Sequence, residues 1–310
     1  MAWQLEHRSA GVACKWLATR PPPKGGLNPK QNKGFNSAAG ERRTLTLCAW
    51  RRHGGALVAE ASSDAAVRLQ EFLPSDARFV ARATLCAHER PVLSMAHVTV
   101  ARSVAQAGRG EGVATGVLFT GTTHGELSAW SVGHLLDRSD ASERALLWRR
   151  RGRHQSGVNA MAAAPVATGV LLVTGGDDQA LSATELHYTE KGLELYAACH
   201  VPCAHASAIQ GVALCEARGA LHVASVGLDQ LLRVWRLQRG GVGGTGGAAT
   251  CAAGLALVDV AARRVDVSEP SCVHGYSRHV EDVNAVTSQR RCAWDVVVGG
   301  RGTQMLRVLL

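Results

Sequence analysis

Cysteine and histidine side chains gather in one short stretch, CHVPCAH, where Cys199, Cys203 and His205 lie within seven residues and Cys215 follows. Thiolate and imidazole groups at such spacing are ligands that zinc prefers. A zinc site usually takes a second ligand pair further along the chain, and the remaining cysteines are too dispersed to supply one. A thiol or metal centre at Cys199, Cys203 and His205 is therefore one hypothesis, and a structural loop is the other.

Other arrangements on which enzymes depend are lacking in the sequence. There is no Gly-x-Ser-x-Gly stretch, and the glycine-rich segments 108–113 and 240–247 lack the Lys-Ser/Thr of a phosphate-binding loop. The adjacent carboxylates Asp177 and Asp178 occupy a tight turn, where neighbouring side chains point apart. The sequence therefore predicts no catalytic residue, no cofactor and no S-adenosylmethionine-binding unit.

Arginines gather beside an aromatic residue in LLWRRRGRH, which holds Trp148, Arg149, Arg150, Arg151 and Arg153. Guanidinium groups can neutralise RNA phosphates, and an indole ring can stack on a base. These five residues are candidates for contact with RNA. The alternative is a solvated loop between structural units, because a charge run is most often a solvated surface.

The net charge of +9 is unevenly distributed along the chain. Residues 1–40 carry six Lys or Arg and one Glu, so +5 lies there and +4 in the rest. The same segment is rich in Pro, Gly and Asn, which predicts a flexible basic leader or linker over 1–40 and a folded domain over 41–310. A mitochondrial targeting segment is an alternative, since acidic residues are scarce, although Arg and Ser are also few.

Composition indicates a soluble globular protein, with 46% hydrophobic and 19% charged residues. The sequence contains no uninterrupted apolar run of about 18 residues, so neither a membrane-spanning helix nor a membrane partner is expected. The nine cysteines are an odd number without paired spacing, and no secretory signal precedes them. A reducing compartment and a cytoplasmic location are expected.

From residue 41 the sequence consists of short apolar runs separated by Gly, Asp and Ser turns, apart from one possible helix at 132–148. Such runs predict an all-β fold. In VASVGLDQLLRVWRL, Ser225 lies four residues before Asp229 and Trp235 lies six after it, and His205 lies upstream. Similar units recur around Asp64, His124 and Asp178, and a degenerate fifth follows near the end. The residues expected to form hydrogen-bond networks are His88, Thr120, Trp130, His154, Thr174, Asp178, His205, Ser225, Asp229 and Trp235.

This recurrence is the pattern of WD repeats, in which His, Ser/Thr, Asp and Trp tie the strands of one blade together. Each satisfied buried polar group avoids a penalty of about 1–3 kcal/mol. We count four to five blades, with insertions at 101–115 and 240–250. The sequence predicts a WD-repeat β-propeller that is incomplete, or the C-terminal propeller of a longer architecture.

Beyond generic WD spacing, the segments HQSGVNAM, VPCAHASAI and RRCAWDVVVGGRG resemble the C-terminal propeller of the WD repeat-containing protein 6 family. The resemblance covers about residues 41–310. It implies a non-catalytic scaffold that binds an FtsJ-like methyltransferase and helps position tRNA for 2′-O-ribose methylation of the wobble nucleotide, and it makes the Trp148–Arg153 cluster a tRNA-binding candidate. A generic propeller adaptor unrelated to RNA is the alternative, and an enzyme with a thiol or metal centre is a third.

Overall fold

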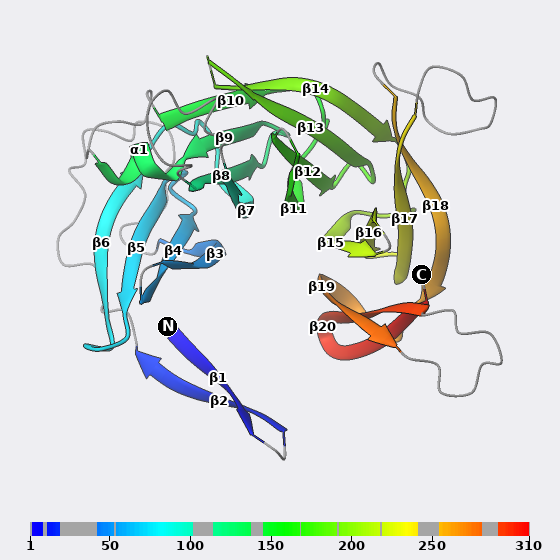
Figure 1. Cartoon of the computed structure of the whole chain (residues 1–310), viewed down its shortest axis with the longest axis horizontal. Coiled ribbons are helices and arrows are strands. Elements are labelled where there is room, and N and C mark those ends of the chain that lie inside the picture. The colour runs from blue at the N-terminus through cyan, green and yellow to red at the C-terminus, as the bar shows by residue number, and fades with distance from the viewer. Residues whose placement is uncertain are drawn as a thin grey trace.

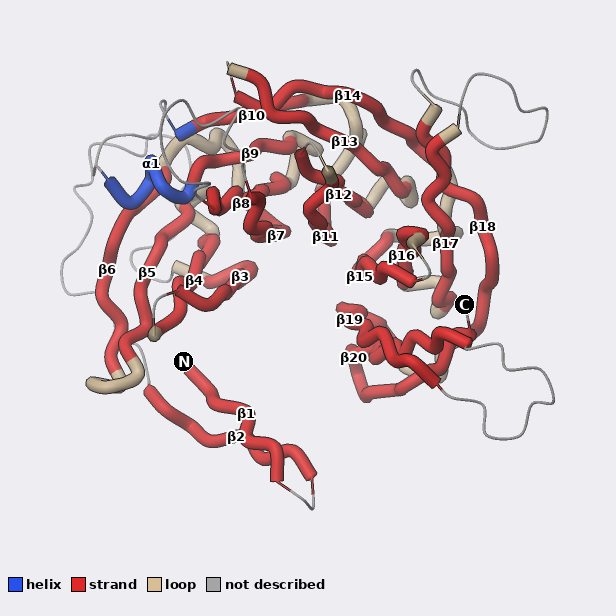
Figure 2. The backbone as a smooth tube through the Cα atoms, in the orientation of Figure 1, coloured by secondary structure: helices blue, strands red, loops and turns tan. Residues whose placement is uncertain are grey.

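Most of the described chain is β-strand. The computed structural model describes residues 2–8, 11–18, 42–52, 54–101, 114–137, 145–167, 169–190, 192–217, 219–240, 254–280 and 291–309. Figures 1 and 2 show antiparallel sheets that follow one another around a common axis. The prediction of an all-β WD-repeat β-propeller is confirmed, and the propeller has five blades.

The first two blades are four-stranded antiparallel meanders, in which each strand pairs with the next along the chain. The first blade comprises β3 (Thr44–Arg52), β4 (Gly55–Ser62), β5 (Val67–Leu73) and β6 (Arg78–Leu85). The second comprises β7 (Val92–Ala101), β8 (Ala114–Thr122), β9 (Leu127–Ser131) and β10 (Leu146–Arg150).

The third and fourth blades repeat this order, and the fifth has two strands. The third comprises β11 (Val158–Val166), β12 (Gly169–Gly176), β13 (Leu181–Thr189) and β14 (Gly192–Val201). The fourth comprises β15 (Ile209–Ala217), β16 (Ala220–Gly227), β17 (Leu231–Arg239) and β18 (Leu255–Arg264). The fifth comprises β19 (Ser268–Val280) and β20 (Arg291–Leu309).

The segment expected to be a leader contains two strands. β1 (Ala2–Arg8) and β2 (Gly11–Ala18) pair as an antiparallel hairpin. Residues 19–41 lie outside the described residues.

The helix expected at 132–148 is wrong in its extent. α1 spans Val132–Asp137 only, and β10 begins at Leu146. The Ser131 hydroxyl accepts the backbone N–H of His134 at 3.4 Å, which satisfies one free donor at the helix start. None of the described helical residues forms a helix long and apolar enough to cross a membrane.

The hydrophobic core is divided among the interfaces between consecutive blades. One cluster joins the third blade to the fourth, through Leu171, Leu181, Ile209 and Trp235, and three similar clusters join the other neighbouring blades. Strand β12 is buried along its whole length because both of its faces meet a neighbouring blade. The apolar runs in the sequence therefore correspond to strands without a solvent-exposed face.

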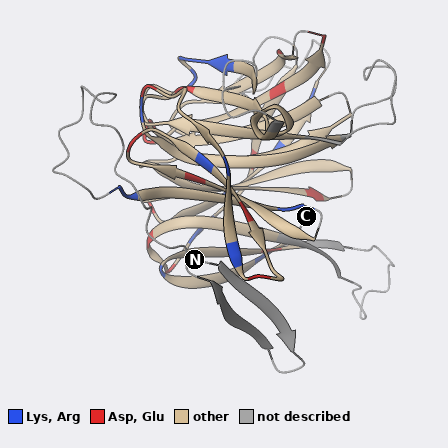
Figure 3. Ribbon diagram, turned by 90° about the vertical axis from the view of Figure 1, so that its left-hand side faces the viewer, with Lys and Arg blue, Asp and Glu red and all other residues tan. Residues whose placement is uncertain are grey.

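Acidic and basic residues are interspersed along the strands of the propeller shown in Figure 3. Several of them form ion pairs between adjacent strands, such as Arg233 on β17 with Asp259 on β18 at 3.0 Å and Arg82 on β6 with Glu71 on β5. Exposed pairs of this kind contribute little to stability, so the fold depends on the apolar interfaces.

Candidate functional site

The fourth blade contains a complete network of the kind expected from the repeats. The Trp235 indole donates to the Ser225 hydroxyl at 2.9 Å, and that hydroxyl lies 2.8 Å from Nε2 of His205. Nδ1 of His205 lies 3.0 Å from the Asp229 carboxylate, which also accepts the backbone N–H groups of Ala206 and Leu231. With the proton of neutral His205 on Nδ1, every buried polar group in this chain of bonds has a partner.

The third blade keeps the same arrangement with one change. Nε2 of His154 lies 2.8 Å from the Thr174 hydroxyl, and Nδ1 lies 3.0 Å from Asp178. Thr184 takes the place of the tryptophan, and its side chain is buried. The structure thus brings His154, Thr174 and Asp178 together without an indole donor.

The carboxylates of both networks have a lowered pKa. Burial alone would raise the pKa of Asp229, but bonds from the Ala206 amide, His205 and the Leu231 amide outweigh it. Burial would also raise the pKa of Asp178, but hydrogen bonds from the His154 side chain and from two backbone amides lower it by more. Burial also lowers the pKa of His205, against the attraction of Asp229. A neutral imidazole beside an ionised carboxylate fits these shifts.

A glycine two residues before the aspartate leaves room for the His–Asp pair. A Cβ atom at Gly227 would lie 2.8 Å from both Asp229 Oδ1 and His205 Nδ1. The corresponding position in the second blade is Thr122, whose hydroxyl accepts the backbone N–H groups of His124 and Glu126. The second blade therefore closes its turn in a different way.

The expected network of the second blade is only partly formed. Trp130 donates to the Thr120 hydroxyl at 3.0 Å, but no residue in the described part of the chain forms a hydrogen bond with either ring nitrogen of the buried His88. His124, at the aspartate position, is exposed. Burial lowers the pKa of His88 to about 4; the charge of Glu126 opposes this shift and that of Arg149 adds to it. His88 is thus a neutral group without a hydrogen-bond partner among the described residues, and its ring is nearly perpendicular to that of Trp130, with ring centroids 5.2 Å apart.

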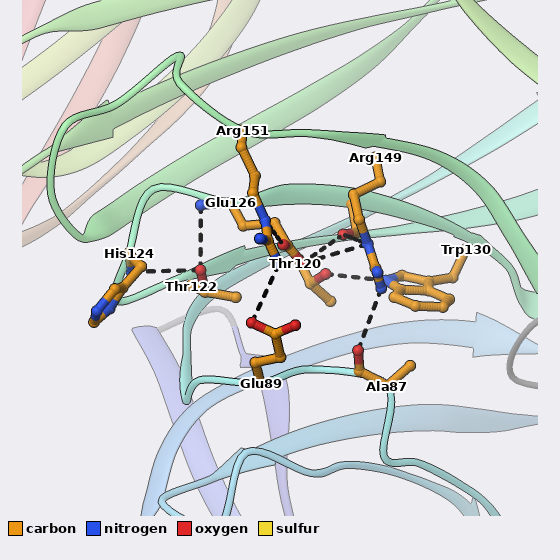
Figure 4. A network of polar contacts seen from close by, with 10 residues as sticks. Ala87, Glu89, Thr120, Thr122, His124, Glu126, Trp130, Arg149 and Arg151 are labelled. Atoms are coloured by element: carbon orange, nitrogen blue, oxygen red, sulfur yellow. Dashed lines mark hydrogen bonds and ion pairs between the residues drawn. The ribbon is translucent and has the colours of Figure 1, made fainter.

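Glu126 replaces the missing aspartate as the charged centre of this blade (Figure 4). Glu126 is buried immediately before β9, and its carboxylate lies 3.4 Å from Nε of Arg149 and 2.6 Å from Nε of Arg151. Arg151 also pairs with the exposed Glu89 at 3.3 Å. Sequence reasoning missed both glutamates, because their partners lie on a strand separated from them by a long connection.

The arginine cluster lies on β10, the outer strand of the second blade, and on the turn after it, rather than wholly in a loop between blades. Arg149 is anchored: its guanidinium donates to the Ala87 carbonyl at 3.2 Å and lies 5.7 Å from the centre of the Trp130 ring. Trp148 is half-buried and packs against the apolar interface with the third blade. Three of the five candidates, Trp148, Arg149 and Arg151, thus have contacts within the protein.

The remaining two candidates have guanidinium groups that are available to a binding partner. Arg150 is exposed and Arg153 is half-buried, and neither guanidinium forms a hydrogen bond or ion pair within the described residues. Nearby, Arg90 and Arg151 line a cavity of about 280 Å³ together with Glu89, Thr122, His124 and Glu126. The surface therefore combines free guanidinium groups with a polar hollow.

The structure does not gather the cysteines and histidine of the other hypothesis into a ligand set. Cys199 is buried in β14, Cys203 lies exposed in the following turn, and both nitrogens of His205 have partners in the blade network. Within the described ranges, no three His, Cys, Asp or Glu side chains lie close enough to hold a metal ion.

We expect Glu126→Gln to lower the free energy of unfolding by about 1.5 kcal/mol, because it removes the charge that compensates two arginines at a buried position. Equilibrium urea denaturation measures the change. Glu89→Gln is the matched control, because Glu89 is 79% exposed and a surface pair contributes about 0.5 kcal/mol or less. Equal losses in the two variants would contradict the role of Glu126.

Comparison with known proteins supports the fold and points to a relative. No protein-family model matches the chain. The tRNA (34-2′-O)-methyltransferase regulator WDR6 of Bos taurus is 29% identical over an alignment of 222 residues, and the alignment covers 64% of this chain and 19% of that protein. The chain thus corresponds to about a fifth of the length of this relative. Together with the blade networks, this similarity shows that the chain is a WD-repeat β-propeller protein resembling WDR6.

Proposed function

We propose that this chain is a non-catalytic scaffold that binds an FtsJ-like 2′-O-ribose methyltransferase and helps position tRNA for methylation of its wobble nucleotide. The observation that supports this proposal is the similarity to WDR6, whose name describes a regulator of a tRNA (34-2′-O)-methyltransferase. A propeller suits the role, because rigid blades hold surface side chains in fixed relative positions. Holding two reactants in register can lower a barrier by several kcal/mol without any catalytic side chain.

The RNA-contacting part of this surface, in our proposal, is Arg150 with Arg153, with Arg151 at the rim of the adjoining cavity. Two free guanidinium groups near one another suit contact with successive phosphates, and such contacts are independent of base sequence. Arg149 and Trp148 support this surface from beneath, since both have contacts within the blade. Contact with tRNA would then be weak by itself, and the methyltransferase would supply the rest.

The cytoplasmic location also belongs to the proposal. Cys48, Cys86, Cys203 and Cys272 are free thiols in the described part of the chain, which suits a reducing compartment. A general adaptor that binds other proteins and no RNA is the second candidate function, since propellers present similar surfaces to many kinds of partner.

We expect the Arg150→Glu/Arg153→Glu variant to retain on the order of tenfold less tRNA than the unsubstituted chain, because two phosphate contacts become repulsive. The tagged full chain is purified from its own cells at two salt concentrations, its bound RNA is sequenced and its bound proteins are identified by mass spectrometry. The methyltransferase is expected with both forms.

Arg236→Glu/Arg263→Glu is the matched control, since both arginines are exposed on the fourth blade and form no ion pair there. It should retain tRNA as the unsubstituted chain does. Recovery of neither a tRNA 2′-O-methyltransferase nor tRNA would overturn the proposal in favour of the adaptor. Equal tRNA loss in the control would overturn the assignment to Arg150 and Arg153.

A further inference from the structure

A groove of about 670 Å³ lies between the third and fourth blades and shares no residue with the arginine cluster. Its apolar lining comes from the end of β11 and from β15 and β16, and includes Pro165, Val166, Leu214 and Leu221. Its polar lining comes from β13, β14 and the end of β17, together with Glu216 on β15.

A β-bulge places an aromatic ring at the rim of this groove. The register between β13 and β14 shifts between Glu185 and Leu186, so Tyr196 is an extra residue without a partner on β13. A bulge re-aims the side chains around it. The Tyr196 ring stacks on His187 with centroids 3.9 Å apart and an interplanar angle of 13°, and Tyr196 is 56% exposed. The other face of the ring is therefore available to a ligand.

Carboxylates dominate the charge of the groove. Glu185 is buried, and its two oxygens lie 3.0 Å from Nε of Arg239 and 3.1 Å from Nε2 of His187. Glu216 also lines the groove and is exposed, and its carboxylate forms no hydrogen bond or ion pair within the described residues. The lining thus contains the two carboxylates of Glu185 and Glu216 and the one guanidinium of Arg239, and this balance favours a positively charged occupant.

We propose that this groove binds an arginine-containing segment of a partner protein. The arginine guanidinium stacks on the exposed face of Tyr196 and donates to Glu216, and an adjacent aliphatic side chain packs against Leu214 and Leu221. A guanidinium suits the site better than an ammonium, because it is planar and stacks on a ring while it donates. RNA suits it less, because phosphates would approach Glu185 and Glu216. This proposal depends on neither the methyltransferase nor tRNA.

The test is a selection of random twelve-residue peptides displayed on phage against the immobilised full chain. Phage are first depleted on the Tyr196→Ala/Glu216→Arg variant, and enriched peptides are synthesised with a fluorescent label for anisotropy titrations. Enriched peptides are expected to carry arginine next to an aliphatic residue. We expect Tyr196→Ala and Glu216→Arg each to weaken their binding about tenfold.

Two control variants test whether binding depends on the stacked ring and on the position of the negative charge. Tyr196→Phe keeps the stacked ring and should bind within about twofold of the unsubstituted chain. Glu190→Arg makes the same charge change as Glu216→Arg in the exposed turn between β13 and β14, outside the groove, and should also leave binding unchanged. Replacement of the peptide's arginine by lysine should weaken binding several-fold.

Three outcomes would overturn the proposal. The first is the absence of arginine among the enriched peptides, or failure to enrich any. The second is equal loss of binding in Glu190→Arg and Glu216→Arg. The third is binding of a labelled hexauridylate RNA that Tyr196→Ala abolishes, since this would assign the ring to a nucleobase.

Discussion

His205→Leu is expected to lower the free energy of unfolding at pH 7 by about 3 kcal/mol, whereas His88→Leu changes it by less than about 1 kcal/mol. Both histidines are buried and each precedes its blade. They differ in their partners. His205 contacts Ser225 and Asp229, whereas neither nitrogen of His88 has a hydrogen-bond partner within the described residues.

The cost at His205 comes from the groups that the substitution leaves behind. Leucine would leave the Asp229 carboxylate without its side-chain donor and the Ser225 hydroxyl without its acceptor, at a site sheltered from water. A buried polar group that loses its partner costs about 1–3 kcal/mol, and a charged one costs more. The backbone N–H of His205 also donates to the Gln179 carbonyl in the third blade, so disorder here would spread across the interface.

At His88 the same substitution removes a polar ring that makes no hydrogen bond. Replacing an unsatisfied buried group by an apolar one of similar size is close to neutral, because the polar ring has already lost its water. Urea denaturation of the two variants at pH 7, followed by tryptophan fluorescence and circular dichroism, measures the difference. Equal destabilisation of the two variants would mean that the hydrogen bonds of His205 contribute nothing beyond packing.

Much of the fold could be predicted from the sequence, because the blade networks require fixed spacings. His205 precedes Ser225 by 20 residues and Asp229 by 24, and His154 precedes Thr174 and Asp178 by the same numbers. One hairpin and one tight turn set these distances. In the second blade the spacing from His88 to Thr120 is longer, because residues 102–113 are inserted between β7 and β8.

The failure of the second-blade network also had a signal in the sequence. Gly176 and Gly227 precede the aspartates of the two His–Asp pairs by two residues, and each lies against its histidine. Thr122 stands at that position in the second blade, and His124 stands at the aspartate position. A residue with a Cβ atom two positions before the turn residue would collide with a His–Asp pair, so Thr122 indicates that the second blade has no such pair.

Other features could not be predicted, since they depend on contacts between separate strands. The pairing of Glu126 with Arg149 and Arg151 requires β10 to lie beside β9, across a connection that the sequence assigned to a longer helix. The bulge at Tyr196 changes a register that alternation alone would continue. The start of the fifth blade at Ser268 could not be predicted, because the described parts of its strands lack the His–Ser/Thr–Asp network that marks the third and fourth blades.

Stability is expected to fall as the pH is lowered from 7 to 5, and His88→Leu is expected to remove about 2 kcal/mol of that fall. His88 has a pKa of about 4 in the folded chain, against an ordinary value of 6.5. Below pH 6.5 the unfolded chain therefore binds a proton at this residue that the folded chain does not bind, and protonation favours unfolding. The stability associated with neutral His88 is complete above pH 6.5 and is lost progressively down to about pH 4.

The size of this effect follows from the interval that the experiment covers. From pH 6.5 to 5 the two states differ by one proton over about 1.5 pH units, at about 1.36 kcal/mol per unit. His97 contributes in the same direction, since burial lowers its pKa to about 4 as well, so the unsubstituted chain loses more than the His88 share. Asp178 and Asp229 have lowered pKa values and lose their contributions at lower pH, outside this interval.

Urea denaturation at pH 7, 6 and 5 separates His88 from the other groups. The His88→Leu chain should be nearly as stable as the unsubstituted chain at pH 7 and more stable at pH 5, so that the two stability curves diverge as the pH falls. His124→Gln, which replaces an exposed imidazole in the same blade, is the control and should follow the unsubstituted chain. Parallel curves for the unsubstituted chain and His88→Leu would show that His88 takes up its proton in the folded state, through a partner such as Glu126, and would contradict the buried, neutral imidazole on which the prediction depends.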